Sequence, residues 1–114
     1  MIIKNFEDLI VWQKAGKITL EIYSNFKNCR DFGFRDQIQR ASVSIMNNIA
    51  EGFERKGNKE FRRFLFIAKG SCGEVRSMTY LAYKLEYLSI EEFRKISSFS
   101  NEITKMLGGL IKKL

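Results

Sequence analysis

The stretch QIQRASVSIMNNIAEG, from Gln37 to Gly52, decides the fold of this chain. With successive side chains about 100° apart on a helix, its apolar residues form two separate lines with a polar stripe between them. The first line is Ile38, Ala41, Ile45 and Ile49, the second is Val43, Met46 and Ala50, and the stripe is Arg40, Ser44, Asn47 and Glu51. Two apolar lines predict a helix that packs against two neighbours. The stripe is expected to be partly buried and hydrogen-bonded between helices.

The composition indicates a helical domain with a basic surface. The 114 residues are 45% hydrophobic and include no proline, which favours long helices. Twenty Lys and Arg residues against 13 Asp and Glu give a net charge of +7, a balance compatible with nucleic acid, an anionic surface or simple solubility. The length predicts one domain over residues 1–114.

The residue types that are missing argue against several function classes. The chain has no histidine, which removes His-based acid–base catalysis, His-activated nucleophiles and the commonest metal ligand. Its two cysteines, Cys29 and Cys72, are far apart and are expected to be core residues in a reducing compartment. Residues 1–4 lack a signal-peptide pattern, and no segment has the roughly 18 apolar residues of a membrane span. We expect a cytoplasmic protein without a cofactor, a metal, a small-molecule substrate or a membrane partner.

Periodicity and capping signals predict four helices. They cover residues Glu7–Lys27, Phe34–Phe53, Lys59–Tyr87 and Ile90–Lys112. The expected end signals are Asn5 and Asn58 as caps, Gly33 as a turn residue, and the capping box Ser89-x-x-Glu92 with a Leu88–Phe93 staple. The short connections predict an all-α, antiparallel up-down-up-down four-helix bundle.

The first predicted helix carries more apolar surface than a monomeric bundle of this size buries. Its apolar residues are Leu9, Val11, Trp12, Ala15, Ile18, Leu20, Ile22, Tyr23 and Phe26. They cover roughly 200° of the helical wheel, about twice the width that a surface helix needs. Part of this arc would stay exposed in a monomer, so the sequence predicts self-association into a homo-oligomer.

The third predicted helix shows three faces. Its core line is Phe61, Phe64, Leu65, Ala68, Cys72, Val75 and Ala82, and a strip of small residues is formed by Gly70, Gly73 and Ser77. Glycine weakens a helix, so the strip predicts a place where another backbone approaches closely. The third face is a basic line, in which Arg62, Lys69 and Arg76 repeat every seven residues and Tyr80, Tyr83 and Tyr87 continue the row.

Three ordered motifs carry a resemblance to a known family. They are F-x-D-L-x-x-W-x-K-A over residues 6–15, Q-x-x-R-A-x-x-S-I-x-x-N-I-A-E-G over residues 37–52, and R-F-L-x-x-A-x-G-S-x-G-E-V-R-S over residues 63–77. The chain resembles the four-helix-bundle family known from 23S rRNA intervening sequences, also labelled S23 ribosomal protein-like. It departs from many relatives at Lys27 and Arg30, where they have Pro and Glu, and at Met46, where they have Pro.

The resemblance implies an antiparallel four-helix bundle that assembles as a ring-like homopentamer. The family is also similar to the basic accessory protein of diversity-generating retroelements, which binds nucleic acid and a reverse transcriptase. No enzymatic activity is established for the family. The resemblance therefore favours a binding or scaffold role over catalysis.

Two functions remain open, and a third is disfavoured. A nucleic-acid scaffold, with structured RNA as the expected ligand, would use the six residues of the basic line and its tyrosines to neutralise phosphates and stack on bases. The alternative is an adaptor that docks a partner protein, since tyrosine and arginine also form interface hot spots. An enzyme is disfavoured, because Glu51 and Glu74 are expected to pair with Arg40 or with a neighbouring subunit.

Overall fold

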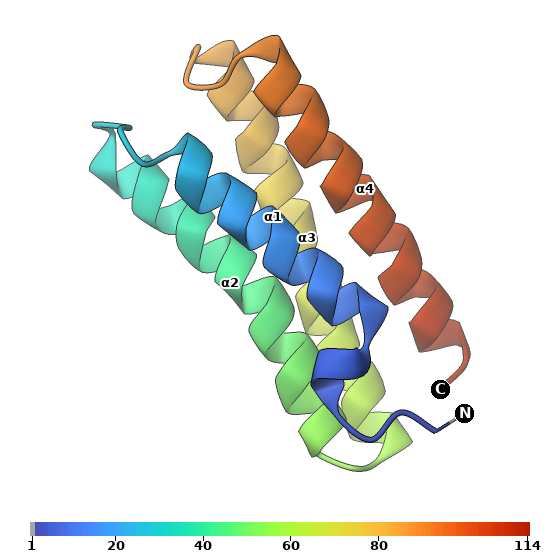
Figure 1. Cartoon of the computed structure of the whole chain (residues 1–114). Helices are drawn as coiled ribbons and strands as arrows, with labels where there is room; N and C mark the ends of the chain where they lie inside the picture. Colours follow the sequence, from blue (N-terminus) through green and yellow to red (C-terminus); the bar gives the residue numbers. More distant parts are fainter. Residues whose placement is uncertain (1) are drawn as a thin grey trace.

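Four long helices account for most of the chain in the computed structural model, which describes residues 2–114. A short 3-10 helix, η1 (Phe6–Asp8), precedes α1 (Ile10–Asn25), α2 (Phe32–Glu54), α3 (Asn58–Lys84) and α4 (Ile90–Lys112). The described residues form no strand, so the predicted all-α class is confirmed. The α1–α2 and α3–α4 connections lie at one end of the molecule, and the α2–α3 connection and both chain ends lie at the other (Figure 1).

The helices enclose one core, to which the first apolar line of α2 contributes all of its members. Ile38, Ile45 and Ile49 are fully buried, and Ala41 is nearly so. The second line is half-buried and lies toward α1, where the Met46 methyl group would stand 3.9 Å from a Cβ atom built at Gly16. Helix α2 therefore packs against two neighbours, as its two apolar lines predicted.

Hydrogen bonds accompany both contacts of α2. The Thr19 hydroxyl of α1 donates to the carbonyl of Ser42 at 3.2 Å, and the hydroxyl groups of Ser44 and Ser71 lie 2.9 Å apart between α2 and α3. The expected burial of the polar stripe is confirmed for Ser44. It is wrong for Arg40, Asn47 and Glu51, which are exposed because that part of the stripe faces the solvent.

The N-terminal prediction needs correction. The expected single helix from Glu7 to Lys27 is divided, because Leu9 has an extended backbone (φ −73°, ψ 122°) that separates η1 from α1. Asn5 precedes η1 but makes no side-chain capping bond. Gly33 is no turn residue, since it lies inside α2, where the side chain of Asp31 caps the helix by accepting from the Phe34 N–H at 3.2 Å.

The later helix boundaries are closer to their predictions. Gly57 rather than Asn58 precedes α3. Helix α3 ends at Lys84 rather than Tyr87, because Glu86 adopts a positive φ of 64° that ends the helical path. The capping box at the start of α4 is confirmed in both directions, with Ser89 accepting from the Glu92 N–H and the Glu92 carboxylate accepting from the Ser89 N–H.

Helix α1 buries only part of its wide apolar arc. Two ion pairs, Lys14–Glu102 and Lys95–Glu21, both 3.0 Å long, connect α1 to α4 beside the buried face. Leu20 remains 72% exposed on the outer side of α1.

None of the helices within residues 2–114 has the length and apolar character needed to cross a bilayer.

Candidate nucleic-acid interface

The basic line predicted on the third helix lies on the exposed side of α3. Arg62, Lys69 and Arg76 are all exposed, and they extend over about 21 Å of the helix axis. Within residues 2–114 their side chains make no ion pair and no hydrogen bond, although the Arg62 guanidinium lies 5.6 Å from the centre of the Phe66 ring. These three cations are therefore available to neutralise an external anion.

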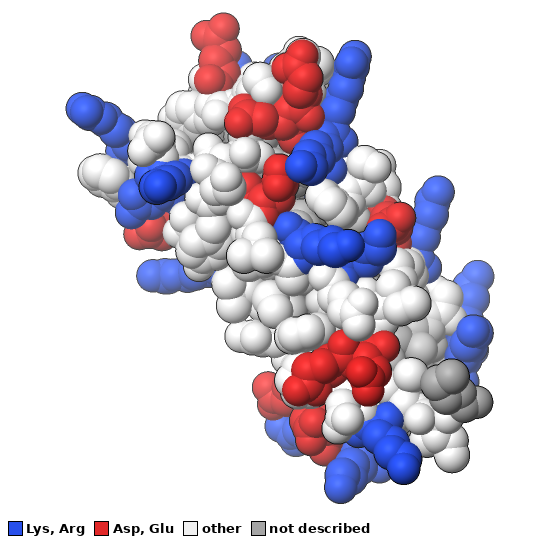
Figure 2. Space-filling view, in the orientation of Figure 1, with Lys and Arg blue, Asp and Glu red and all other residues white. Residues whose placement is uncertain are grey.

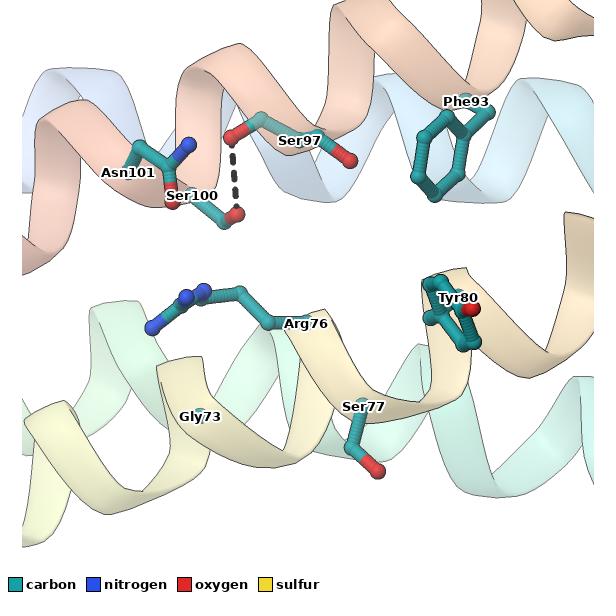
Figure 3. Close-up of a pocket in the computed structure, with 8 residues that line it drawn as sticks. All are labelled: Gly73, Arg76, Ser77, Tyr80, Phe93, Ser97, Ser100 and Asn101. Carbon is teal, nitrogen blue, oxygen red and sulfur yellow. Dashed lines mark hydrogen bonds between the residues drawn. The ribbon is translucent and has the colours of Figure 1, made fainter.

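Tyr80 follows Arg76 by one helical turn, and the two residues line the same groove between α3 and α4. The groove has a volume of about 400 Å³. Its walls are Gly73, Arg76, Ser77 and Tyr80 from α3 and Phe93, Ser97, Ser100 and Asn101 from α4 (Figure 3). The structure thus brings one cation and one tyrosine of the predicted row together in a shared cavity.

Tyr83 is more buried than Tyr80 and packs more closely against α4. It is half-buried, and its ring stacks on Phe93 of α4 with the ring centres 4.8 Å apart. Tyr80, which is 56% exposed, touches the same Phe93 edge-on at 6.3 Å. The ammonium group of Lys84 lies above both tyrosines, at 5.4 and 6.0 Å from the ring centres. Lys84 therefore adds a cation that the predicted row did not include.

Tyr87 lies apart from the other five residues of the row. Its hydroxyl donates to the Asp31 carboxylate at 2.8 Å, and its ring packs edge-on against Phe34 at 5.4 Å. The hydrogen bond to the carboxylate raises the pKa of Tyr87. Tyr87 lies beyond the end of α3, in the segment that leads to α4, so it does not continue the row. Its contacts link this segment to the start of α2 instead.

A second basic group surrounds Arg62 at the opposite end of α3. Lys59, Arg62, Arg63, Phe66 and Leu114 line a shallow pocket of about 430 Å³. The Arg63 guanidinium group donates a 2.9 Å hydrogen bond to the Glu60 carboxylate, and this bond lowers the pKa of the Glu60 carboxyl group. Lys59 and Arg62 remain without an acidic partner among the described residues, and their i, i+3 spacing was the signal that would have joined Lys59 to the predicted row.

Four residues of the groove were not predicted as site residues, because they come from α4: Phe93, Ser97, Ser100 and Asn101. Phe93 was predicted to form a staple with Leu88, and Ser97 and Asn101 follow Phe93 at four-residue spacing on the same side. The spacing shows that these three share a face. Their position opposite Arg76 and Tyr80 depends on the register between two helices, for which the sequence carries no local signal.

The two carboxylates considered for catalysis have structural partners. Glu51 pairs with Arg55 at 2.9 Å, and Glu74 accepts a hydrogen bond from the Gln37 amide at 3.2 Å. The expected pairing with Arg40 is wrong within the chain, because Arg40 lies three turns, or about 16 Å, before Glu51 on the same helix. In the described part of the chain no group of three or more acidic or cysteine side chains is placed to hold a metal ion.

The side of the molecule on which α1 lies carries both acidic and basic side chains. The face in Figure 2, where α1 lies in front, shows acidic side chains near both ends and basic ones among them. An uncharged area lies over the middle of α2, beside the charged side chains that cross the middle of α1. This face therefore presents no continuous basic surface.

Comparison with known proteins finds a matching family model and a similar solved structure. The family model described as "23S rRNA-intervening sequence protein" matches residues 7–109. The crystal structure of a protein of unknown function from the S23 ribosomal protein family of Bacteroides thetaiotaomicron VPI-5482 is similar over 90% of this chain and 98% of that chain, with a TM-score of 0.84 and 28% sequence identity. No curated protein matches. The resemblance predicted from the three motifs is thereby confirmed.

Proposed function

The chain belongs to the family of 23S rRNA-intervening sequence proteins, and on this premise we propose that it is a non-catalytic, oligomeric scaffold that binds structured RNA or another nucleic acid. The observation that carries the proposal is the set of three exposed cations on α3, Arg62, Lys69 and Arg76, which have no acidic partner within residues 2–114. A cation that is already paired gains little from a phosphate, whereas an unpaired one gains the full counterion-release effect.

The spacing of the three cations suits a nucleic-acid backbone. Seven residues of helix correspond to about 10 Å, and the phosphates of one duplex strand follow one another at about 3.4 Å along the axis. Each step of the basic line therefore covers roughly three nucleotides. Such contacts would position the protein on a phosphate backbone without reading its sequence.

We also propose that the bundle is antiparallel and forms a ring-like homopentamer. The contact pairs support the first part, since Lys14 meets Glu102 while Glu21, further along α1, meets Lys95, which precedes Glu102 on α4. Exposed Leu20, together with the uncharged area in Figure 2, supports self-association. Five copies of a +7 chain would carry +35, a field that attracts polyanions. With both cysteines free, we place the assembly in the reducing cytoplasm.

Binding of the purified protein to structured RNA, single-stranded RNA and duplex DNA over a salt series tests the scaffold. The triple variant R62E/K69E/R76E should bind at least about tenfold more weakly and show a shallower salt dependence, because phosphate contacts are lost. The matched control K17E/K27E/K105E changes the net charge equally, at exposed lysines of α1, the connection after it, and α4. Equal binding by the two triple variants would refute the interface on α3.

The alternative, an adaptor for a partner protein, is favoured by a different feature of α3. Ile67, Leu81 and Leu85 are between 41% and 47% exposed. They lie on the side of the strip of small residues that is turned away from the basic line, and they form a separate apolar face there. An apolar protein interface weakens little with salt, so a partner retained from nuclease-treated lysate at high salt would favour this function over the scaffold.

A further inference from the structure

The groove between α3 and α4 combines an aromatic ring, a cation and free polar groups. Tyr80 lies at one end, and the Arg76 side chain extends away from it toward the end of the groove where Asn101 lies (Figure 3). The ring and the guanidinium group therefore stand at opposite ends of a cavity of about 400 Å³. Gly73 leaves the α3 wall open, since a Cβ atom built there would have no neighbour within 4 Å.

Several polar side chains that line the groove have no polar partner among the described residues. Within residues 2–114 the side chains of Ser97 and Asn101 make no hydrogen bond, and Arg76 makes no ion pair. The Ser100 hydroxyl is different, because it donates to the Ser97 carbonyl at 3.0 Å. Ser97 and Asn101 can thus donate to a ligand and accept from it, and Arg76 can donate to an anion.

The Tyr80 ring is held in place but is only partly covered. Phe93 supports it edge-on from α4, and the Lys84 ammonium lies 5.4 Å from its centre. More than half of the tyrosine surface remains exposed. A fixed and exposed aromatic face is a stacking platform for another flat ring, and its stacking energy does not depend on which base is bound.

We propose that this groove binds one unpaired nucleotide, with the base stacked on Tyr80, the phosphate on Arg76, and Ser97 and Asn101 hydrogen-bonded to the base or the sugar between them. The proposal rests on the proposed nucleic-acid function and narrows it to ligands with unpaired bases. Both faces of a base inside a duplex are already stacked, so a duplex can contact the basic line but not this platform. The cavity lies near the lower end of the ~300–1,000 Å³ range of ligand pockets, a size for one nucleotide.

The experiment uses the full chain and three probes. They are a single-stranded RNA with one 2-aminopurine, the same strand in a duplex, and adenosine monophosphate. The variants Tyr80→Leu and Arg76→Gln are compared with Tyr23→Leu and Lys17→Gln, which alter an exposed tyrosine and an exposed lysine of α1. Leucine retains an apolar contact with Phe93, and circular dichroism verifies that each variant is folded.

Tyr80→Leu should weaken single-strand binding at least about tenfold and remove the fluorescence change of the bound 2-aminopurine, while duplex binding changes less than about twofold. Arg76→Gln should weaken both ligands, since the phosphate contact is common to them. Competition by adenosine monophosphate would identify a free nucleotide as a ligand of the groove. Binding of the strand alone would assign the groove to a nucleotide within a chain.

Two results would overturn the inference, and they are distinguishable. If the wild type binds both RNA forms with a steep salt dependence but Tyr80→Leu has no more effect than Tyr23→Leu, the groove is no nucleotide site and the scaffold remains. If the wild type binds none of the probes at low salt, the proposed function and this inference fail together.

Discussion

Gly52 of α2 faces Phe64 of α3 so closely that a Cβ atom built on the glycine would lie 2.6 Å from the Phe64 Cβ. The same atom would lie 3.3 Å from the Phe61 carbonyl oxygen. Both neighbours are backbone or next to it, so a small side-chain rotation cannot relieve the contact. Gly52 is therefore the residue that permits the close approach of α2 and α3 near their connection.

Replacement of Gly52 by alanine should destabilise the protein. The added methyl group forces the two helices apart, and overpacking of this kind costs roughly 1–3 kcal/mol. Urea denaturation followed by circular dichroism measures the change in the free energy of unfolding. Gly16→Ala is the matched control, because its methyl group would meet only Met46 at an ordinary 3.9 Å. Equal stability of the two variants would contradict the close approach.

Gly70→Ala separates the stability of the helix from the assembly of the subunits. A Cβ atom at Gly70 would meet nothing within 4 Å, so alanine should stabilise α3 in the monomer by roughly 0.5–1 kcal/mol. If subunits pack on the strip of small residues, the same methyl group should reduce the molar mass measured by light scattering. Gly109→Ala on α4, which is equally open, should raise the melting temperature without a change in mass. An unchanged mass for Gly70→Ala would place the subunit contact elsewhere.

Tyr87→Phe should reveal a pH-dependent contribution to stability. The hydrogen bond to Asp31 raises the pKa of Tyr87 in the folded protein above its value of about 10 in an unfolded chain. The resulting stabilisation is complete below pH ~10 and is lost as the pH rises through the folded-state pKa. The wild type should melt at a higher temperature than Tyr87→Phe at neutral pH, and this difference should shrink above pH ~10. A difference that stays constant up to pH ~11 would show that the hydroxyl is not bound to the carboxylate.

The two cysteines should react with iodoacetamide at very different rates. Cys72 is fully buried, and desolvation raises the pKa of its thiol, which suppresses the reactive thiolate. Cys29 is only partly buried. Mass spectrometry should find Cys29 labelled in the folded protein and Cys72 labelled only after denaturation. Fast labelling of the folded Cys29→Ser variant would mean that the core around Cys72 opens readily.

The exposed line of α3 could be predicted because every one of its members is close to the next in sequence. Arg62, Lys69 and Arg76 share a face through helical periodicity alone. Helical periodicity also placed Ile38, Ile45 and Ile49 in the core. A short motif, Ser89-x-x-Glu92, placed the capping box. Helical periodicity could not predict the position of Tyr87, because Glu86 adopts a positive φ and the helix ends before Tyr87.

By itself, the sequence determined four helices, their buried faces and the family to which the chain belongs, because these properties depend on residues within a few turns of one another. Only the tertiary structure decided that Phe93, Ser97 and Asn101 face Arg76 and Tyr80, and that Tyr87 reaches Asp31. Those contacts join positions between 13 and 56 residues apart. Their register results from the packing of whole helix faces and from single close approaches such as that of Gly52 to Phe64, which no local pattern encodes.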